Sequence, residues 1–398
     1  MAGREAGLLR RRDRNVCRSR YQDCVAVATN PNVFCNGLAY YPPNPHQHIV
    51  TRVLDAEGHG DLVKVLIATD GPTHARVRSM LSMPFSPSRI AQMESAIDGI
   101  VLEQLAPLVS RGRAEAVSEF ALPLPVNVIA HLFGIERASL GHLARWATAY
   151  VDIIYGRAKD PDDAERIGRD FADYQNFLTD LIAARRDASD NLVSQIIKAR
   201  TPGHEPFSEP ELLAIFVQLM NAGTVTTTDA ITSMMVHLAR HPGELSTLRS
   251  SAEPDLALRR YIEELLRMYP PQRGQPRVAT EDTILAGVAI PKGANVFLSW
   301  HSANHDQAMF GRTADDFDAQ RSNAQRHLAF GHGVHTCIGN ALARVELKCV
   351  LRAFAQHIHA LCFEHPETQL EIRPDLYLPQ IARLPVRFDS ARPNGAAR

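Results

Sequence analysis

The chain has 398 residues, of which 45% are hydrophobic and 22% are charged, a composition that supports a large buried core. Its 43 basic and 44 acidic residues give a formal net charge of -1 at pH 7, which argues against a general nucleic-acid-binding protein. No apolar run reaches the length of a membrane span, and the polar N-terminal residues lack the apolar core of a secretory signal. We therefore expect one domain over residues 1–398, in the cytoplasm, with neither a nucleic-acid nor a membrane partner.

The N-terminal half predicts helices after an irregular start. Residues 1–70 show no regular pattern and include a proline-rich stretch at 40–45. Residues 73–200 have the periodicity of amphipathic helices interrupted by proline and glycine, for example at 140–155 and 163–185.

The longest helix is expected at 209–240. Ser208 and Glu211 have the spacing of a capping box, and the His-Pro-Gly sequence at 241–243 ends the helix. At about 1.5 Å per residue the helix would be roughly 48 Å long, enough to cross a whole domain. Its apolar residues lie on nearly all faces, which indicates that it is buried.

The C-terminal half adds the strands. A helix is expected at 255–268, ended by Pro270 and Pro271, and residues 283–300 have the pattern of short strands around glycine-containing turns. A final helix is expected at 338–357. The fold class is therefore mainly α with a minor β region.

The six cysteines do not predict disulfides. A long chain without an export signal is expected in a reducing compartment, where thiols stay free. In such a protein a cysteine with distinctive neighbours more commonly binds a metal or takes part in chemistry. The candidates are Cys17, Cys24, Cys35, Cys337, Cys349 and Cys362.

Cys337 lies in the sequence FGHGVHTCIG at 330–339, the most informative stretch of the chain. Two glycines within a few residues predict a tight loop, and the cysteine is expected at the start of the final helix. Free N–H groups and the positive end of the helix dipole favour the thiolate, which is a strong ligand for haem iron. Zinc bound by His332, His335 and Cys337 is an alternative, but the stretch has no CxxC pair and no clear fourth ligand.

This stretch resembles the haem-binding signature of the cytochrome P450 family at every defining position. The resemblance extends from about residue 16 to residue 387. It implies the cytochrome P450 fold with the long helix lying over the haem, haem b as the cofactor, and Cys337 as the axial ligand of the iron. Phe330 and Gly339 would belong to the loop that binds the haem.

Glu264 and Arg267 share a helix face at i, i+3 and can form an ion pair. In the family this pair joins a downstream arginine and holds the loop that presents the cysteine, and Arg321 matches that third position. The resemblance thus implies a structural role for these three residues.

Haem propionates need cationic or hydrogen-bonding partners when they are buried. His74 and Arg78 share a helix face at i, i+4, and Arg277 is expected to open a strand. His335 lies two residues before Cys337. All four residues match positions that bind propionates in the family.

The long helix carries the oxygen side of the haem. Ala222 and Gly223 would let a flat ligand approach the backbone, and a threonine hydroxyl can bond the carbonyl one turn back. Thr226 matches the family's threonine that helps to deliver protons during oxygen activation. Val225 stands where the family usually has an acid, and valine cannot supply a proton. Asp229 lies one turn further on the same face, which by itself does not predict a proton-transfer role.

A second departure from the family, after Val225, lies in the N-terminal region. The stretch beginning at Val16 resembles an early strand and helix, before which members usually have several dozen residues, whereas fifteen precede it here. Either the chain starts late or part of the small β region is lost, and such a loss would leave a strand edge unpaired.

The resemblance implies a haem-thiolate monooxygenase that activates O2 to oxidise a small apolar, natural-product-like molecule, as in secondary metabolism. Because the chain has no flavin or nicotinamide motif, the electrons are expected from a ferredoxin and its reductase. Val225 leaves open an alternative haem-thiolate chemistry, namely oxidative coupling, peroxide use or nitric-oxide reduction. A non-catalytic scaffold relative is a third interpretation, although such a relative would be expected to lose the cysteine ligand.

Four basic residues are candidates for contact with the protein that donates electrons. They form either a docking surface for an acidic protein or an ordinary solvated surface, and the sequence favours neither. They are Arg76, Arg344, Lys348 and Arg352.

Overall fold

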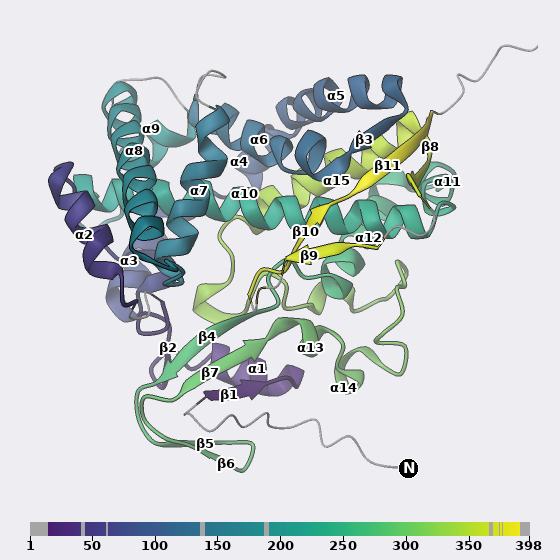
Figure 1. Ribbon diagram of the computed structural model, residues 1–398. Helices are drawn as coiled ribbons and strands as arrows, with labels where there is room; N and C mark the ends of the chain where they lie inside the picture. The colour runs from purple at the N-terminus through teal and green to yellow at the C-terminus, as the bar shows by residue number, and fades with distance from the viewer. Residues whose placement is uncertain are drawn as a thin grey trace, which may run out of the picture.

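The computed structural model confirms a fold that is mainly α with a minor β region (Figure 1). The residues that it describes are 15–40, 44–60, 63–135, 140–186, 191–365, 369–373, 375 and 377–390. The helices are α1 Tyr21–Ala28, α2 Gln47–Ala56, α3 Gly71–Ser82, α4 Pro87–Gln92, α5 Glu94–Arg111, α6 Pro123–Phe133, α7 Leu140–Ile154, α8 Pro161–Arg185, α9 Leu192–Ile197, α10 Glu209–Arg240, α11 Glu244–Arg249, α12 Pro254–Met268, α13 Trp300–Asn304, α14 Gln307–Phe310 and α15 Asn340–His357. The strands are β1 Asn15–Arg18, β2 Phe34–Cys35, β3 Arg113–Glu115, β4 Gly274–Ala279, β5 Thr283–Leu285, β6 Val288–Ile290, β7 Asn295–Ser299, β8 Ile358–Phe363, β9 Glu371–Arg373, β10 Gln380–Arg383 and β11 Pro385–Ser390.

Helix α10 runs across the centre of the molecule, and its bounds are those predicted (Figure 1). Its N-terminus has the predicted capping box. The Glu211 N–H donates to Ser208 Oγ at 3.4 Å, and the Ser208 N–H donates to the Glu211 carboxylate at 2.9 Å. Most of its side chains are buried in the larger of two hydrophobic cores, so this helix fixes the position of its neighbours.

A four-stranded sheet with the order β1-β7-β4-β2 lies on one side of α10 (Figure 1). Strand β1 pairs in parallel with β7, and β2 pairs with β4 in the antiparallel sense. The prediction of an irregular N-terminal region is therefore wrong in the described part, because β1, α1, β2 and α2 occupy it. Strand β1 and helix α1 agree with the early strand and helix that the resemblance implies from Val16, whereas β2 has two residues and pairs with β4 far along the chain.

The remaining strands form small sheets beside the helices. Strands β3, β11 and β8 form one sheet in the order β3-β11-β8, while β5 pairs with β6 and β9 with β10. Strands β5, β6 and β7 confirm the strand pattern predicted for residues 283–300. A smaller hydrophobic core, which includes Val296, Leu298 and Trp300, fills the space against the four-stranded sheet. In the described ranges, no helix combines the length and the apolar character that crossing a bilayer requires.

Candidate active site

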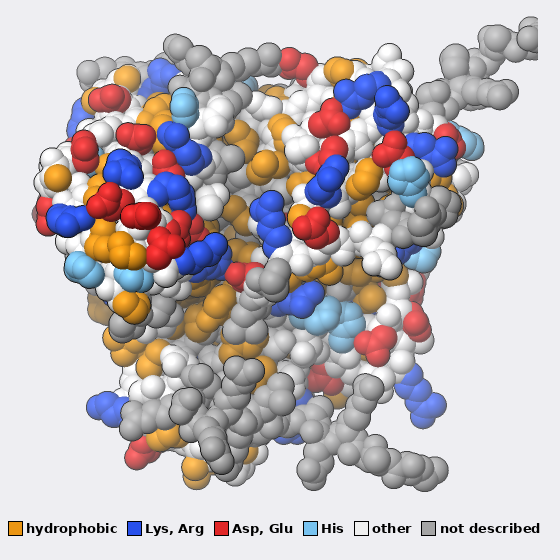
Figure 2. All heavy atoms as spheres, in the orientation of Figure 1, with side chains coloured by type: hydrophobic (Ala, Val, Ile, Leu, Met, Phe, Trp, Pro, Cys, Tyr) orange, Lys and Arg blue, Asp and Glu red, His pale blue; other side chains and the backbone are white. Residues whose placement is uncertain are grey.

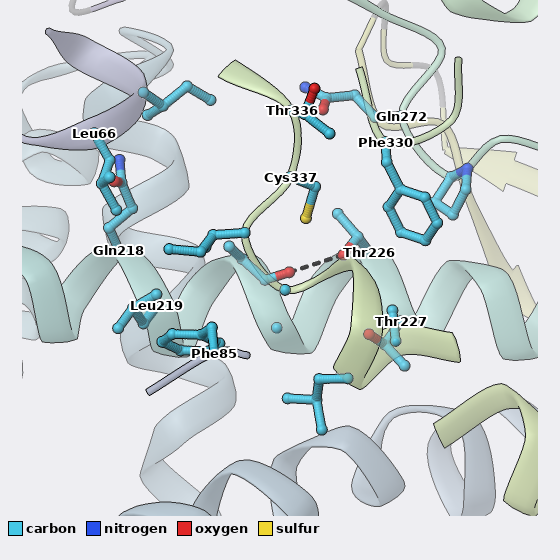
Figure 3. Close-up of a pocket in the computed structure, with 18 of the residues that line it drawn as sticks. Leu66, Phe85, Gln218, Leu219, Thr226, Thr227, Gln272, Phe330, Thr336 and Cys337 are labelled. Carbon is cyan, nitrogen blue, oxygen red and sulfur yellow. Dashed lines mark hydrogen bonds between the residues drawn. The ribbon is translucent and has the colours of Figure 1, made fainter. Parts of the chain in front are cut away.

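A cavity lies between α10 and the loop that precedes α15, with about 1430 Å3 of space free of protein atoms, part of it open to solvent. Cys337 lines it from the loop, with its Sγ pointing toward α10, and Thr226 lines it from that helix (Figure 3). Most of the other side chains on the wall are apolar. The predicted haem-site residues found on this wall are His74, Arg78, Ala222, Gly223, Thr226, Phe330, His335, Cys337 and Gly339.

Two glycines shape the loop that carries Cys337. Gly331 and Gly333 have φ angles of +70° and +73°, in the left-handed region that favours glycine. A Cβ at Gly333 would lie 2.3 Å from the Ala28 carbonyl oxygen, so no larger residue fits there. The loop closes with a hydrogen bond from the Cys337 N–H to the Phe330 carbonyl at 2.8 Å. The tight turn predicted from the glycines is therefore present.

The helix after this loop begins later than predicted. Helix α15 starts at Asn340 rather than at 338, so Cys337 lies before the helix and not in its first turn. Although the Cys337 side chain is exposed to the cavity, the protein around the thiol desolvates it and raises its pKa. The Gly339 N–H and the charges of Arg78 and Arg344 lower that pKa without reversing the direction. The expectation that the loop alone favours the thiolate is therefore wrong, and a cation bound at Sγ would supply the missing stabilisation.

The zinc alternative finds no support in the arrangement of the ligands. Within the described part of the chain, one group of His, Cys, Asp and Glu side chains is close enough to share a metal ion, namely Glu94, Asp98 and Cys349. His332 and His335 are not gathered around the loop cysteine in this way. The thiol thus faces an apolar cavity rather than a ring of nitrogen and oxygen ligands.

Basic side chains form one edge of the cavity beside the loop. The Arg78 Nη1 donates to the Thr336 carbonyl at 2.5 Å, and His335 Nε2 lies 3.1 Å from the Asp70 carboxylate. The His74 ring is 4.2 Å from the ring of His335, measured between centroids. Burial lowers the pKa of His74 to about 4, with smaller contributions from its positive neighbours His335 and Arg78. This edge therefore offers hydrogen-bond donors of the kind that buried carboxylates need.

Arg277 lies elsewhere than expected. It occupies the middle of β4 rather than its start, and it is 2% exposed. Its guanidinium donates to the Pro276 carbonyl at 2.7 Å and to the Gln275 side chain at 3.4 Å, and burial lowers its pKa. Gln275 lines the cavity, whereas Arg277 is not on its wall.

The threonines of α10 bond the helix's own backbone, as predicted. The Thr226 hydroxyl donates to the Ala222 carbonyl at 2.8 Å (Figure 3). Thr224 bonds the carbonyl one turn back in the same way, also at 2.8 Å. Gly223 lines the cavity, but a Cβ there would lie 2.8 Å from the Ile129 side chain of α6. The glycine therefore makes room for helix packing as well as for a ligand.

Asp229 does not replace the acid missing at Val225. Its side chain is 7% exposed and is not on the cavity wall, and burial raises its pKa to about 8 despite a hydrogen bond with Gln380. The carboxyl is thus a neutral buried group at neutral pH, turned toward β10. This placement agrees with the expectation that sharing a helix face with Val225 does not create a proton route.

Glu346 is the acid that the sequence analysis missed. It lies in α15, is 1% exposed and lines the cavity, and its Oε2 has no hydrogen-bond partner among the described residues. Burial raises the pKa of Glu346 well above its usual value and so favours the protonated carboxyl. One turn before it lies Leu342, which also lines the cavity, so an acid on this apolar helix face was a readable signal.

Glu264, Arg267 and Arg321 come together in a buried ion cluster. Arg267 donates to both carboxylate oxygens of Glu264 at 2.8 Å, and Arg321 Nε donates to the same carboxylate at 3.0 Å. Arg267 also donates to the Asn304 carbonyl at 2.7 Å, and the Asn304 side chain accepts from the Leu328 N–H at 2.7 Å. The cluster therefore reaches the segment that leads into the loop of Cys337.

The four basic residues considered as a docking surface are all ion-paired. Lys348 contacts Glu94 at 2.6 Å, and Arg352 contacts the same carboxylate at 2.9 Å as well as Asp98. Arg344 pairs with Glu263 at 2.6 Å. In the same way, Arg76 pairs with Glu211. Opposite charges are also interspersed over α7 and α8, where arginines pair with aspartates (Figure 2). None of the four residues therefore presents an uncompensated charge.

Comparisons with known proteins agree with this site. A family model described as "Cytochrome P450" matches residues 256–380. Steroid C26-monooxygenase of Mycobacterium tuberculosis is 30% identical over 387 residues, which cover 96% of this chain and 98% of that protein. 6-Deoxyerythronolide B hydroxylase of Saccharopolyspora erythraea is 32% identical over 322 residues, which cover 81% of this chain and 77% of that protein.

A solved structure of a cytochrome P450 from Chondromyces apiculatus has the same fold. Its TM-score is 0.83 at 26% sequence identity, and the match covers 98% of this chain and 93% of that one. The similarity to this structure identifies the fold, and the similarity to relatives named as a hydroxylase and a monooxygenase identifies the type of reaction. The chain belongs to the cytochrome P450 family and is an oxidoreductase of the monooxygenase type, with haem iron as its cofactor.

Proposed function

We propose that this protein uses haem b, O2 and electrons from a ferredoxin and its reductase to insert oxygen into a small apolar, natural-product-like molecule. The observation that carries the proposal is the thiol of Cys337, which points into an apolar cavity toward Thr226 (Figure 3). All six cysteines lie in the described part of the chain and none of them forms a disulfide, which supports a reducing compartment such as the cytoplasm.

The residues around the cavity fit a haem. Cys337 would hold the haem iron through its Sγ, and the iron's positive charge would offset the burial that raises the pKa of the thiol. His74, Arg78 and His335 would hold the propionates, with Arg277 as a further positive charge. Haem iron held in this way supplies the two-electron reduction of O2 and the transfer of one oxygen atom to the substrate.

Other residues keep the site in shape. The Arg344 guanidinium lies over the Phe330 ring, 4.5 Å from the ring centroid. Phe330 would pack against the haem from the cysteine side. Gly339 lies beside the sulfur, and a Cβ there would make an ordinary contact of 3.9 Å with the Cys337 Sγ. Ala222 and Gly223 would line the oxygen side, where Thr226 orients water with its hydroxyl.

Protons for the reaction would come from Glu346 rather than from the position of Val225. Reduction of O2 to water and an inserted oxygen atom consumes two protons, so the site needs a group that can donate them. Burial favours the protonated form of both Glu346 and Asp229, but Glu346 lies on the cavity wall and Asp229 lies off it. Glu346 would therefore act as the acid and be reprotonated through water.

The apolar wall favours a substrate that is largely apolar. Leu66, Phe85, Leu192 and Leu219 lie on the cavity wall, and burial of apolar surface would be the main source of affinity. Relatives named for 6-deoxyerythronolide B, steroids and mycinamicin IV support a natural-product-like substrate.

The test of this function is the source of the inserted oxygen. The purified holoenzyme, supplied with a ferredoxin, its reductase and a panel of apolar natural products under isotope-labelled O2, should give a product that carries the label. A product without label, or turnover with peroxide alone, would show the alternative chemistry that Val225 leaves open. Consumption of nitric oxide with NADH and no oxygenated product would equally overturn the proposal.

Glu346→Gln should lower the rate of product formation by about tenfold or more, because a positioned general acid contributes on the order of a hundredfold or more to such steps. The amide keeps the neutral shape of the protonated acid, so folding and the haem spectrum should be unchanged. Asp229→Asn is the matched control, because it removes a buried neutral acid that is not on the cavity wall. Rates within twofold of each other for the two variants would contradict the assignment of Glu346.

A further inference from the structure

Gln218 is a polar residue without a partner on the cavity wall. It lies in α10 and is 8% exposed, and its side chain forms no hydrogen bond with the described residues. Its Oε1 is sealed from solvent with no donor near it. In Figure 3 the side chain lies at the end of the cavity away from Thr226, close to Leu66. A buried amide that finds no partner in the protein is costly and is satisfied by a ligand or by water.

The surroundings of Gln218 favour a neutral ligand group. An amide both donates and accepts one hydrogen bond in the same place, so it complements a hydroxyl or carbonyl group. The neutral amide has no hydrogen bond to a charged side chain among the described residues, so it would offer a buried carboxylate no counter-charge. Leu219, the next residue, and Leu66 provide apolar surface beside the amide (Figure 3).

Gln218 lies about two helical turns before Thr226 on α10, which sets the distance between these two residues along the cavity. Gln218 and Thr226 both line the cavity and are separated by eight residues of α10. At about 1.5 Å per residue, that separation is roughly 12 Å along the helix axis. A molecule that contacts both residues would therefore be elongated.

We propose that Gln218 is a specificity-determining residue whose amide binds a neutral hydroxyl or carbonyl group of an otherwise apolar substrate, at the end of the cavity away from Thr226. The inference rests on the proposed function, since it deepens the description of the same cavity. It predicts an elongated substrate with a neutral polar end, rather than an acid or a pure hydrocarbon.

The test compares two probes that differ in one group. 1-Decanol has a hydroxyl at one end of a flexible apolar chain, and undecane has a methyl group in its place. Equilibrium dialysis against the holoenzyme gives the dissociation constant of each probe. The ratio of the two constants should change by about five- to tenfold between the wild type and Gln218→Met, which removes the amide but keeps the length of the side chain.

Gln104→Leu is the matched control. Gln104 is also an amide whose side-chain atoms are buried without partners, but it lies in α5, which contributes no residue to the cavity wall. This variant should leave the probe ratio unchanged. If Gln218→Met leaves the ratio unchanged as well, or if both variants change it equally, water alone satisfies Gln218 and the inference is wrong.

The two proposals fail in different ways. Dialysis measures binding without any chemistry, so a wild-type preference for 1-decanol that depends on Gln218 stands even if no labelled oxygen is inserted. That combination would contradict the proposed function and support the role of Gln218 in binding. Insertion of labelled oxygen, together with a probe ratio that is the same in the wild type and in Gln218→Met, would support the function and contradict the role of Gln218.

Discussion

Cys337→Ala is expected to abolish the activity and the spectrum that thiolate-ligated haem gives when it is reduced and bound to carbon monoxide. The thiolate donates electron density to the iron and assists cleavage of the O–O bond, and no other cysteine lines the cavity wall. The red-shifted Soret band of the wild type should be absent from the variant, and product formation should fall to background.

Cys362→Ala is the control for this variant. Cys362 is a half-buried free cysteine of β8, away from the cavity wall, so its loss should preserve the spectrum. A wild-type spectrum typical of histidine-ligated haem would overturn the ligand assignment. So would a red-shifted band that survives in Cys337→Ala.

Arg267→Ala should destabilise the fold by about 3–5 kcal/mol, because it leaves the carboxylate of Glu264 buried without its main counter-charge. Both side chains are 0% exposed, so water cannot replace the lost hydrogen bonds. The variant also loses its bonds to the carbonyls of Asn304 and Ala314, which position the segment before the loop of Cys337. Urea unfolding followed by circular dichroism measures the loss.

Arg260→Ala separates the loss of an arginine from the loss of this cluster. Arg260 lies on the same helix, α12, is exposed, and donates a hydrogen bond to the Gln320 side chain at 2.8 Å. Its removal should change the free energy of unfolding by less than about 0.5 kcal/mol. If Arg267→Ala costs no more than Arg260→Ala, the cluster does not carry the stability assigned to it. A stable Arg267→Ala protein that retains haem would also contradict its proposed role in holding the loop.

The elements with strong local signals were predictable from the sequence. Ser208 and Glu211 fixed the start of α10, and the glycines at 331 and 333 fixed the turn before Cys337, because in each case neighbouring residues determine the backbone. The contact between Glu264 and Arg267 follows from helix spacing. Its complete burial does not, since it depends on segments that lie far along the chain.

What the sequence left out depends on packing between distant segments. An acid at Glu346 stands out on an apolar helix face and Gln218 does not, but only the folded chain shows that both line the cavity with one side-chain oxygen unsatisfied. Arg277 was placed at the start of a strand because the pairing of β4 with β7 has no local pattern. The pKa of Cys337 was predicted in the wrong direction because desolvation by the surrounding fold outweighs the helix end.

The pairing of the basic residues has a consequence for how fast an electron donor arrives. Arg76, Arg344, Lys348 and Arg352 each face a carboxylate, so their fields largely cancel beyond the Debye length of about 10 Å at 0.1 M salt. An acidic protein approaching them by diffusion therefore meets little long-range attraction. Its association rate should depend only weakly on ionic strength, and recognition would rest on short-range contacts made after the collision.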